Sequence, residues 1–388
     1  MNAIRSRIAI AVAALALLAP TGASADGFWR ITGAGFGHGV GMSQYGAAGL
    51  ARHGSGWRRI LRHYYQGTSI NPVPSQSVRV LLASGLPTAS FSGVTVACGQ
   101  ELIETKTYAA VAVDKGIEVS NPAGKPLWIC TGAIQAAGGE SFALAGSGEY
   151  RGMLQLSSSG SGGLDAVDEV DIESYVRGVV PNESPSRWPA AALRAQAVAA
   201  RSYALATRSD EGVFDLYQDT RSQVYGGVAS ETPSSDAASA KTAGLVVTYN
   251  GEIATTYFSS TSGGHTENVE NVFGGPEVPY LRGVPDPYDA ASPYHRWRER
   301  LSPAAMDAAL AGLAKGSVRE IRVTKTGASP RIREAEIVGS EGITEVDGST
   351  LQSRLGLRDR WASFALVPSR RQARHAAVRL SRLVSGYW

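Results

Sequence analysis

The segment from Pro189 to Leu205 constrains the fold most strongly, because its composition and spacing fit a closely packed helix. Proline is favoured at the first helical position, where its missing amide hydrogen is not needed. Four small or apolar side chains then recur at helical spacing and define one buried face. They are Leu193, Ala197, Ala200 and Ala204. The segment therefore predicts a helix that packs closely through alanine.

Other local patterns predict a mixture of helices and strands. Asn250-Gly251, between the β-prone runs 245–249 and 252–259, is the strongest short signal for a hairpin. Asp171 is the expected N-cap of a short helix over 172–179. Further helices are expected over 43–52, 55–65 and 304–314, and further strands over 78–83, 318–323 and 331–338.

The region from about Gly85 to Asp165 is rich in Thr, Val, Gly and Ser in short alternating runs, which is typical of β structure. We interpret it as a β-rich subdomain inserted into a larger α+β fold. The expected parts of the 388-residue chain are a signal peptide over 1–25, a Gly/His-rich segment over 26–72, a main domain over 73–368 and a basic tail over 369–388.

The first 25 residues have the three parts of a secretion signal. Arg5 and Arg7 precede an apolar run from Ile8 to Leu18, and small residues at 23–25 suit cleavage. The run is too short to span a bilayer as a lasting helix. An uncleaved anchor is the alternative, but we expect a mature, exported protein that begins near Asp26.

The formal net charge is only +3, with acids and bases mixed along most of the chain, so nothing points to nucleic acid as a partner. The two cysteines, Cys98 and Cys130, are expected to form a structural disulfide or to be buried free thiols. Neither has a nearby histidine, so we predict no metal site and no cofactor.

The tail from Ser369 carries five arginines and no acid. It is compatible with an amphipathic helix that contacts anionic wall polymer or membrane lipid, or with a solvated terminus.

Glu183 is the first candidate for chemistry. Prolines at 181, 185 and 189 predict a stiff loop around it, and Trp188 offers an apolar wall. The alternative is a capping carboxylate ahead of the following helix, which the helix dipole favours. The two interpretations conflict, because a helix N-terminus lowers a carboxylate pKa whereas a general acid needs it raised.

Three further segments contain polar residues suited to a ligand site. The first runs from His38 to Ala47, the second from Asp219 to Gly226 and the third from Ser259 to His265. Each alone also fits an ordinary turn, and none shows the spacing of a nucleophilic triad. Their candidate residues are His38, Gln44, Tyr45, Gln223, Tyr225, Ser260 and Ser262.

Taken together, these segments resemble the stage II sporulation protein D (SpoIID) / LytB family. The resemblance is carried by the stretches 38–47, 178–183, 193–204, 223–226 and 257–264, and it covers most of the mature chain. Only the β-rich region and the basic tail fall outside it. The family name does not by itself establish a sporulation role.

The resemblance implies a peptidoglycan lytic transglycosylase, with Glu183 as the catalytic residue, or an enhancer of a cell-wall amidase. The implied partners are glycan strands and such an amidase. A generic secreted binding domain is a third alternative, but it leaves the 193–204 motif unexplained. Expected substrate contacts come from the candidate residues above and from Arg201, which we favour as a brace. Asp219 and Asp286 are the candidates for a second carboxylate.

The sequence departs from the family pattern in two ways. Some relatives bind zinc through a His-Cys pair before the Gln-Val-Tyr element, where this chain has Arg221-Ser222, so no zinc is predicted. The His38–Ala47 segment also comes first here, whereas it follows the rest of the domain in the sporulation protein. We infer a circular permutation, which is tolerated where the termini lie close together. It predicts that residues 364–366 lie beside residues 29–31.

Overall fold

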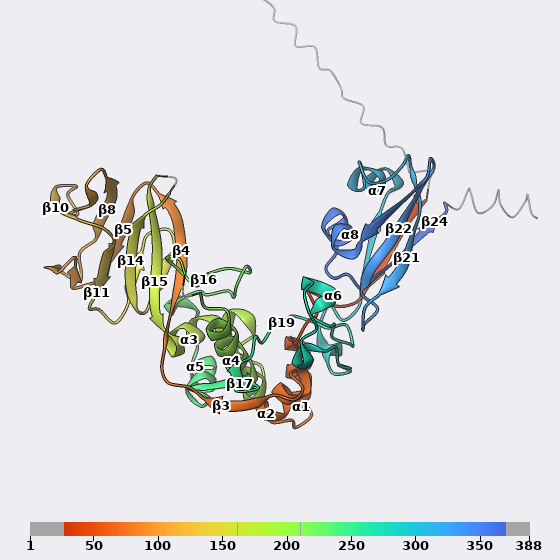
Figure 1. The fold of residues 1–388 in the computed structure, drawn as a ribbon, viewed down its shortest axis with the longest axis horizontal. Helices are drawn as coiled ribbons and strands as arrows, with labels where there is room; N and C mark the ends of the chain where they lie inside the picture. Colours follow the sequence, from red (N-terminus) through yellow and green to blue (C-terminus); the bar gives the residue numbers. More distant parts are fainter. Residues whose placement is uncertain (1–26, 161, 210, 370–388) are drawn as a thin grey trace, which may run out of the picture.

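The protein has three structural regions that follow one another along an arc (Figure 1). A computed structural model describes residues 27–160, 162–209 and 211–369. A β-sandwich lies at one end, a helical region at the middle and a second α+β lobe at the other end. The mixed α+β class predicted from the sequence is therefore confirmed.

The β-sandwich contains two antiparallel-rich sheets that share one hydrophobic core. The seven-stranded sheet comprises, in order, β16 (Leu216–Tyr217), β4 (Ser77–Leu86), β15 (Leu164–Asp171), β14 (Met153–Ser158), β11 (Ile134–Ala137), β6 (Val96–Ala97) and β7 (Gln100–Glu101). The six-stranded sheet comprises β10 (Pro126–Cys130), β9 (Gly116–Ser120), β8 (Tyr108–Val113), β5 (Ala89–Ser92), β12 (Phe142–Leu144) and β13 (Gly148–Tyr150). The expected β-rich region therefore consists of strands, and its flanking strands β4 and β15 extend it at both ends.

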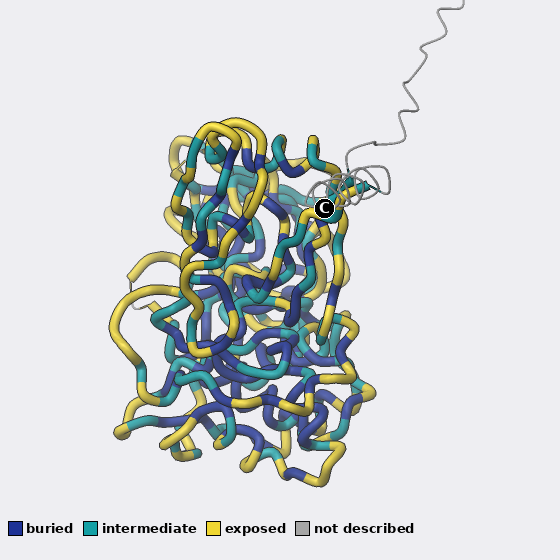
Figure 2. Tube along the Cα trace, turned by 90° about the vertical axis from the view of Figure 1, so that its right-hand side faces the viewer, coloured by how far each residue is buried: buried dark blue, intermediate teal, exposed yellow. Residues whose placement is uncertain are grey.

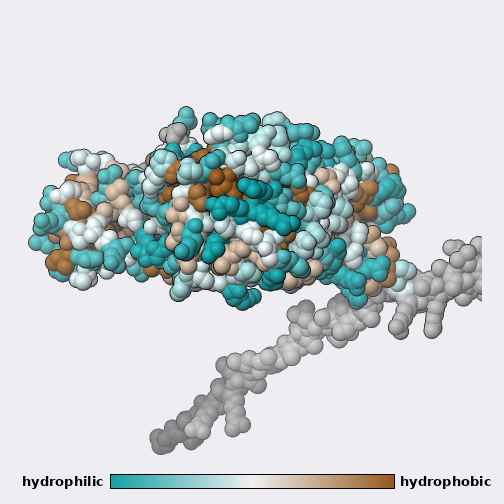
Figure 3. Space-filling model, turned by 90° about the horizontal axis from the view of Figure 1, so that it is seen from below, coloured by the Kyte–Doolittle hydropathy of each residue, from teal (hydrophilic) through white to brown (hydrophobic). Residues whose placement is uncertain are grey.

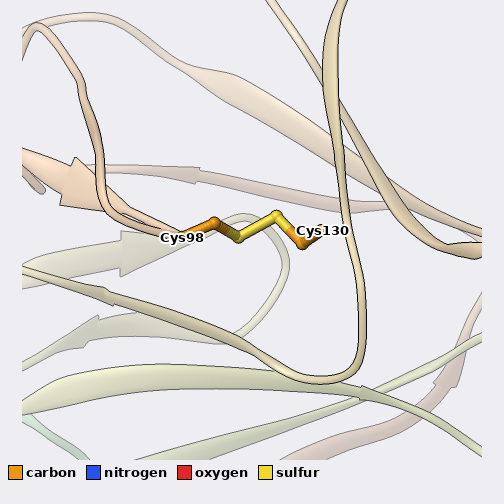
Figure 4. The surroundings of a disulfide bond; sticks show 2 residues. All are labelled: Cys98 and Cys130. Atoms are coloured by element: carbon orange, nitrogen blue, oxygen red, sulfur yellow. A yellow bond between two sulfur atoms is a disulfide. The ribbon is translucent and has the colours of Figure 1, made fainter.

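A disulfide between Cys98 and Cys130 links the two sheets (Figure 4). Cys98 follows β6 at one edge of the seven-stranded sheet, and Cys130 ends β10 at the edge of the six-stranded sheet. Among the described residues no free cysteine remains. The disulfide alternative from the sequence is thus confirmed.

Removing this disulfide is expected to lower the free energy of unfolding by about 2–4 kcal/mol, because it closes a long loop in the unfolded chain. The bridged cysteines are 32 residues apart. Urea unfolding of a double Cys98→Ser, Cys130→Ser variant would measure the change. Equal unfolding midpoints for this variant and the wild type would contradict the expectation.

The central region is built around α4 (Ala190–Ala206), which is buried along most of its length. Leu193, Ala197 and Ala200 pack into the core that reaches the sandwich, whereas Ala195 and Val198 pack into a second core beneath α1 and α2. The alanine-rich sequence thus lets α4 pack closely on more than the one predicted face. Buried segments are concentrated in this part of the molecule (Figure 2).

The remaining central elements surround α4. They are α1 (Gln44–Arg52), α2 (Trp57–Tyr64), α3 (Ile172–Glu183), α5 (Pro233–Ala240), α6 (Glu270–Phe273), the sheet of β3 (Ser69–Pro72), β17 (Leu245–Tyr249) and β18 (Glu252–Ile253), the pair of β2 (Met42–Ser43) and β19 (Phe258–Ser259), and the 3-10 turns η1 (Val228–Ser230), η2 (Pro279–Leu281) and η3 (Asp289–Ala291). Asp171 caps α3 as predicted, by accepting the Glu173 amide at 2.9 Å. Asn250 and Gly251 have positive φ angles of 51° and 91°, which suits the predicted hairpin turn.

The C-terminal lobe combines two three-stranded sheets with two helices around a third core. Its elements are β1 (Phe28–Gly33), β20 (Trp297–Leu301), β24 (Ala362–Val367), β21 (Val318–Thr326), β22 (Ile332–Gly339), β23 (Ile343–Asp347), α7 (Pro303–Ala309) and α8 (Gly348–Leu355). β1 pairs with β24 so that Trp29, Arg30 and Ile31 face Leu366, Ala365 and Phe364. The predicted neighbourhood of the two ends is confirmed, whereas the permutation itself stays a prediction.

Some predicted boundaries were wrong. The helix predicted over 304–314 ends at Ala309, and the second strand of the hairpin ends at Ile253. The predicted signal peptide over 1–25 and the tail beyond Ser369 lie outside the described residues. Across the described ranges, no helix has the length and apolar character needed to cross a membrane.

Candidate active site

Glu183 is the last residue of α3, and not part of a loop as predicted. Pro181 lies inside the helix, where it removes one backbone hydrogen bond. The Asn182 side chain donates to the Gly178 carbonyl at 2.8 Å, which supplies a hydrogen bond to a carbonyl near the end of α3. Gly178 is required here too, because a Cβ would lie 2.5 Å from the Tyr225 ring. The helix C-terminus, with its partial negative charge, therefore presents the carboxylate.

Three distant segments of the chain meet at the Glu183 carboxylate. Gln44, the first residue of α1, donates its Nε2 hydrogen to Oε2 at 3.0 Å. The backbone amide of Val224 donates to Oε1 at 3.0 Å. Of the segments that the sequence singled out, 38–47 and 219–226 thus contact Glu183 directly.

Burial raises the pKa of the Glu183 carboxyl group above its ordinary value, and the hydrogen bonds from Val224 and Gln44 oppose this shift. The position at a helix C-terminus disfavours the charged form as well. The dipole effect and the raised pKa of a general acid therefore no longer conflict, because the carboxylate lies at the C-terminus of α3 and not at the N-terminus of α4. The site favours a protonated glutamate more than an exposed side chain would.

A cleft of about 330 Å³ is lined by residues 220–223, which directly precede Val224, the residue whose amide binds this carboxylate. Its walls are mainly aromatic, with a polar margin at 220–222. The rings of Tyr257 and Phe273 stack with their centroids 4.8 Å apart, and Tyr203 lies 5.8 Å from Tyr257. Such a cleft offers flat apolar surfaces beside hydrogen-bonding groups, which suits a sugar ring.

His38 lines the cleft, but its ring nitrogens serve the protein backbone. Nδ1 accepts the Val40 amide at 3.0 Å. Burial lowers the pKa of His38 to about 4, although the backbone interaction with Phe258 opposes this change. The imidazole is therefore neutral near pH 7, and its ring packs against the aromatic wall, with its centroid 5.3 Å from that of Phe273.

Three predicted ligand-binding residues have structural roles instead. Tyr225 is buried and donates to Asp168 at 2.9 Å. Arg201 is fully buried and pairs with Glu173, in the first turn of α3, at 2.6 Å, so it braces the start of this helix. Ser262 is fully buried and donates to Asp286 at 2.7 Å. These residues shape the site without reaching the cleft.

The other predicted contacts differ in burial: Tyr45 and Ser260 are half-buried, and Gln223 is buried. Tyr45 is half-buried, with its ring centroid 4.9 Å from that of Trp188. Its amide donates to the Ser260 carbonyl at 3.0 Å, which joins the 259–262 segment to α1. Gln223 is buried, and its Nε2 donates to the Ala200 carbonyl at 3.2 Å. A direct role of Tyr45, Ser260 and Gln223 in binding stays a prediction.

Neither candidate for a second carboxylate contacts Glu183. Asp219 is exposed and pairs with Arg221 at 2.8 Å, and this hydrogen-bonded pairing lowers the pKa of Asp219 to about 2. Asp286 is fully buried beneath α1, where it accepts hydrogen bonds from Tyr64 and Ser262. Neither residue therefore forms a pair of carboxylates with Glu183.

The sequence did not single out the aromatic wall of Tyr203, Tyr257 and Phe273. These residues come from α4, from the segment before β19 and from α6, so only the fold brings them together.

The sequence also does not show that Tyr175, Gln196 and Gln223 each bury a polar atom that lacks a partner among the described residues. Such groups are stabilised when water or ligand hydroxyls reach them. In the described part of the chain, no cluster of three or more His, Cys, Asp or Glu could hold a metal ion.

A profile of the family described as "Stage II sporulation protein" matches residues 160–249, which include Glu183 and α4. The chain is 30% identical to stage II sporulation protein D of Bacillus subtilis over 209 residues, 50% of this chain and 60% of the relative. It is 38% identical to the amidase enhancer of Bacillus subtilis over 142 residues, 37% of this chain and 19% of the relative. An uncharacterized protein of Brachyspira hyodysenteriae is 45% identical over 121 residues, 30% of this chain and 33% of the relative.

The fold and the site thus define a mixed α+β protein in which a part-buried glutamate lies close in the chain contacts to an aromatic cleft. Residues 160–249 thus match the SpoIID family, and the resemblance to the SpoIID/LytB family that the sequence predicted is confirmed by this match and by the named relatives. It spans between 19% and 60% of the length of these curated relatives.

Proposed function

We propose that this is an exported protein of the bacterial cell wall that cleaves peptidoglycan glycan strands as a lytic transglycosylase. The observation that carries the proposal is Glu183, a part-buried carboxyl group with a raised pKa, held by Gln44 and Val224 next to an aromatic cleft. Family membership supports the cell-wall setting. The N-terminal sequence pattern supports export.

In the proposed reaction, protonated Glu183 donates its proton to the oxygen between N-acetylmuramic acid and N-acetylglucosamine. The bond from that oxygen to muramyl C1 breaks through an oxocarbenium-like state. The C6 hydroxyl of the same muramyl residue then bonds to C1, and Glu183 accepts its proton. The products are a free N-acetylglucosamine hydroxyl and a 1,6-anhydro end. One carboxyl group suffices, which agrees with the contacts of Asp219 and Asp286, since these are with residues other than Glu183.

Digestion of purified glycan strands, followed by mass analysis of the products, tests this function. Anhydro ends that form with the wild type support it. Ends that carry an added water would show hydrolysis and would require a second carboxylate or another water-activating group. Intact strands after long incubation would contradict the enzymatic proposal.

A second candidate function is a non-catalytic enhancer of a wall amidase. It is favoured by the match to a relative named amidase enhancer. Under this alternative the same cleft binds glycan but does not cut it. Binding without any cleavage, together with faster release of stem peptides when an amidase is added, would favour the enhancer.

Gln44 offers a test of how Glu183 is tuned. Its amide donates to the charged carboxylate, so it lowers the pKa of Glu183. A Gln44→Leu variant is therefore expected to raise that pKa, and because the acid must start protonated, the alkaline limb of the pH–rate profile moves to higher pH. Profiles of kcat/KM for both proteins would show this. A limb that stays in place or moves to lower pH would contradict the assignment of Glu183 as the acid.

A further inference from the structure

The C-terminal lobe has a cavity of about 390 Å³ that the proposed reaction does not use. It lies where β1 and β24 meet the end of β21. Trp361 and Arg296 supply its aromatic and charged lining, and Thr32, Ser363 and Thr326 supply hydroxyl groups. The cavity therefore combines a flat ring, a cation and polar groups in one place.

Arg296 is a cation without an acidic partner. Its Nη1 donates to the Gly263 carbonyl at 2.8 Å, and the guanidinium carbon lies 5.6 Å from the Trp361 ring centroid. Between residues 27 and 369, positions 161 and 210 aside, no carboxylate lies within 4.0 Å of it. A guanidinium that is held by carbonyls and an aromatic ring has further N–H groups available to bind a planar anion such as a carboxylate.

The hydroxyl groups lie on the strands beside this pair. Thr32 Oγ1 and Ser363 Oγ are hydrogen-bonded at 2.7 Å across β1 and β24. Ser363 is exposed and Thr32 is half-buried, so both can exchange this bond for one with a ligand. Hydroxyls at the edge of an aromatic surface match a sugar, which presents C–H groups on its face and hydroxyls at its rim.

One glycine-rich loop connects this cavity with the cleft at Glu183. Ala34 lines the cavity and donates its amide to the Trp361 carbonyl at 3.0 Å, whereas His38 lines the cleft. Between them Phe36 is 40% exposed, with its ring centroid 4.7 Å from that of Tyr294. Three residues therefore separate Ala34 from His38, so their backbones are at most roughly 14 Å apart.

We propose that this cavity is a second saccharide-binding site, which holds a carboxylate-bearing amino-sugar chain beside the catalytic cleft. Trp361 stacks on a sugar ring, Arg296 binds the carboxylate, and Thr32 and Ser363 bind hydroxyls. The polymer class rests on the proposed function, since muramyl residues carry a lactyl carboxylate. A chain that occupies both sites would be bound more tightly than either site alone allows.

The test uses the whole chain with Glu183→Gln, so that ligands are not cut. Calorimetry would measure the binding of two ligands of equal length. One is glycan strands freed of stem peptides, whose muramyl residues carry free lactyl carboxylates, and the other is neutral chitin oligosaccharides. Arg296→Gln is expected to weaken binding of the acidic strands about tenfold and to leave the neutral ones unchanged. Trp361→Ala is expected to weaken both about tenfold, and Trp361→Phe is expected to restore most of the loss. Arg319→Gln, an exposed arginine on β21, is the matched control.

Affinities within about twofold of the parent for both Arg296→Gln and Trp361→Ala would overturn the second site. Melting temperatures check that each variant is folded, and Arg296 is exposed enough for its substitution to be tolerated. Failure of the proposed function is separate: wild type that binds strands through Arg296 but never cuts them would refute the enzyme and keep the site.

Discussion

Replacing Glu183 with glutamine is expected to slow glycan cleavage by about a hundred- to ten-thousandfold, the usual contribution of a positioned general acid. The amide has nearly the same shape and can still accept the Val224 hydrogen bond, but it has no acidic proton to donate. Release of anhydro-muropeptides over time, quantified by mass spectrometry, would measure the loss. Urea unfolding should show that the variant remains folded.

Asp219→Asn is the matched carboxylate control. Asp219 lies within the segment that borders the cleft, but it is exposed and paired with Arg221. Its substitution is expected to leave both the rate and the anhydro product unchanged. A rate loss comparable to that of Glu183→Gln would show that a second carboxylate takes part. Cleavage by Glu183→Gln at the wild-type rate would remove Glu183 from the mechanism altogether.

Replacing Arg331 with methionine is expected to lower the free energy of unfolding by about 3–5 kcal/mol, because it leaves a buried carboxylate unpaired. Arg331 precedes β22 and is 1% exposed. It pairs with Asp359 at 2.7 Å and donates to the carbonyls of Ser262 and His265. Gly39 packs directly on it, since a Cβ there would lie 2.3 Å from its guanidinium carbon. The loss would therefore loosen the contact between the C-terminal lobe and the 38–41 loop.

Two comparisons make this expectation specific. Adding Asp359→Asn should recover part of the lost stability, because it removes the unpaired charge and can still accept the Trp361 amide. Lys325→Met breaks an exposed pair with Glu334 and should cost about 1 kcal/mol or less. Urea unfolding midpoints would decide. Equal losses for Arg331→Met and Lys325→Met would show that burial of the pair is unimportant.

Local signals in the sequence predicted the elements that local energetics determine. The Asn250-Gly251 turn needs two positive φ angles, which these residues tolerate better than most. The Asp171 cap satisfies an amide at the start of α3, whatever packs around it. The pairing of β1 with β24 was predictable for another reason, since it followed from the family resemblance and the changed order of motifs.

The position of Glu183 was not predictable from local rules. Pro181 indicated the end of a helix, but the structure continues α3 to Glu183. Packing of Val179 and Val180 into the core, and the Asn182 bond to Gly178, stabilise this last turn. The sequence placed Glu183 beside the wrong helix end, which reversed the expected sign of the dipole effect on its pKa, whereas its catalytic role stays a prediction.

Polar residues within the family motifs were also misinterpreted. Tyr225 and Ser262 were predicted as ligand contacts because they are polar and lie in the motifs that carry the resemblance, whereas Arg201 was favoured as a brace. In the structure the three are paired with Asp168, Asp286 and Glu173, of which Asp168 and Asp286 are buried and Glu173 is half-buried. Burial of a polar side chain is favourable only with such a partner, and the partner lies far away in sequence. Composition therefore could not separate a brace from a binding residue.

The pairing of β1 with β24 also has a mechanical meaning. Phe28, near the start of the described chain, faces Val367, near its end, so both ends leave the antiparallel pair at the same point. Tension applied to the two ends would break the ladder bond by bond and would not shear all the bonds at once. The C-terminal lobe would open first, while α4 and the Glu183 cleft, buried in the two other cores, would stay intact.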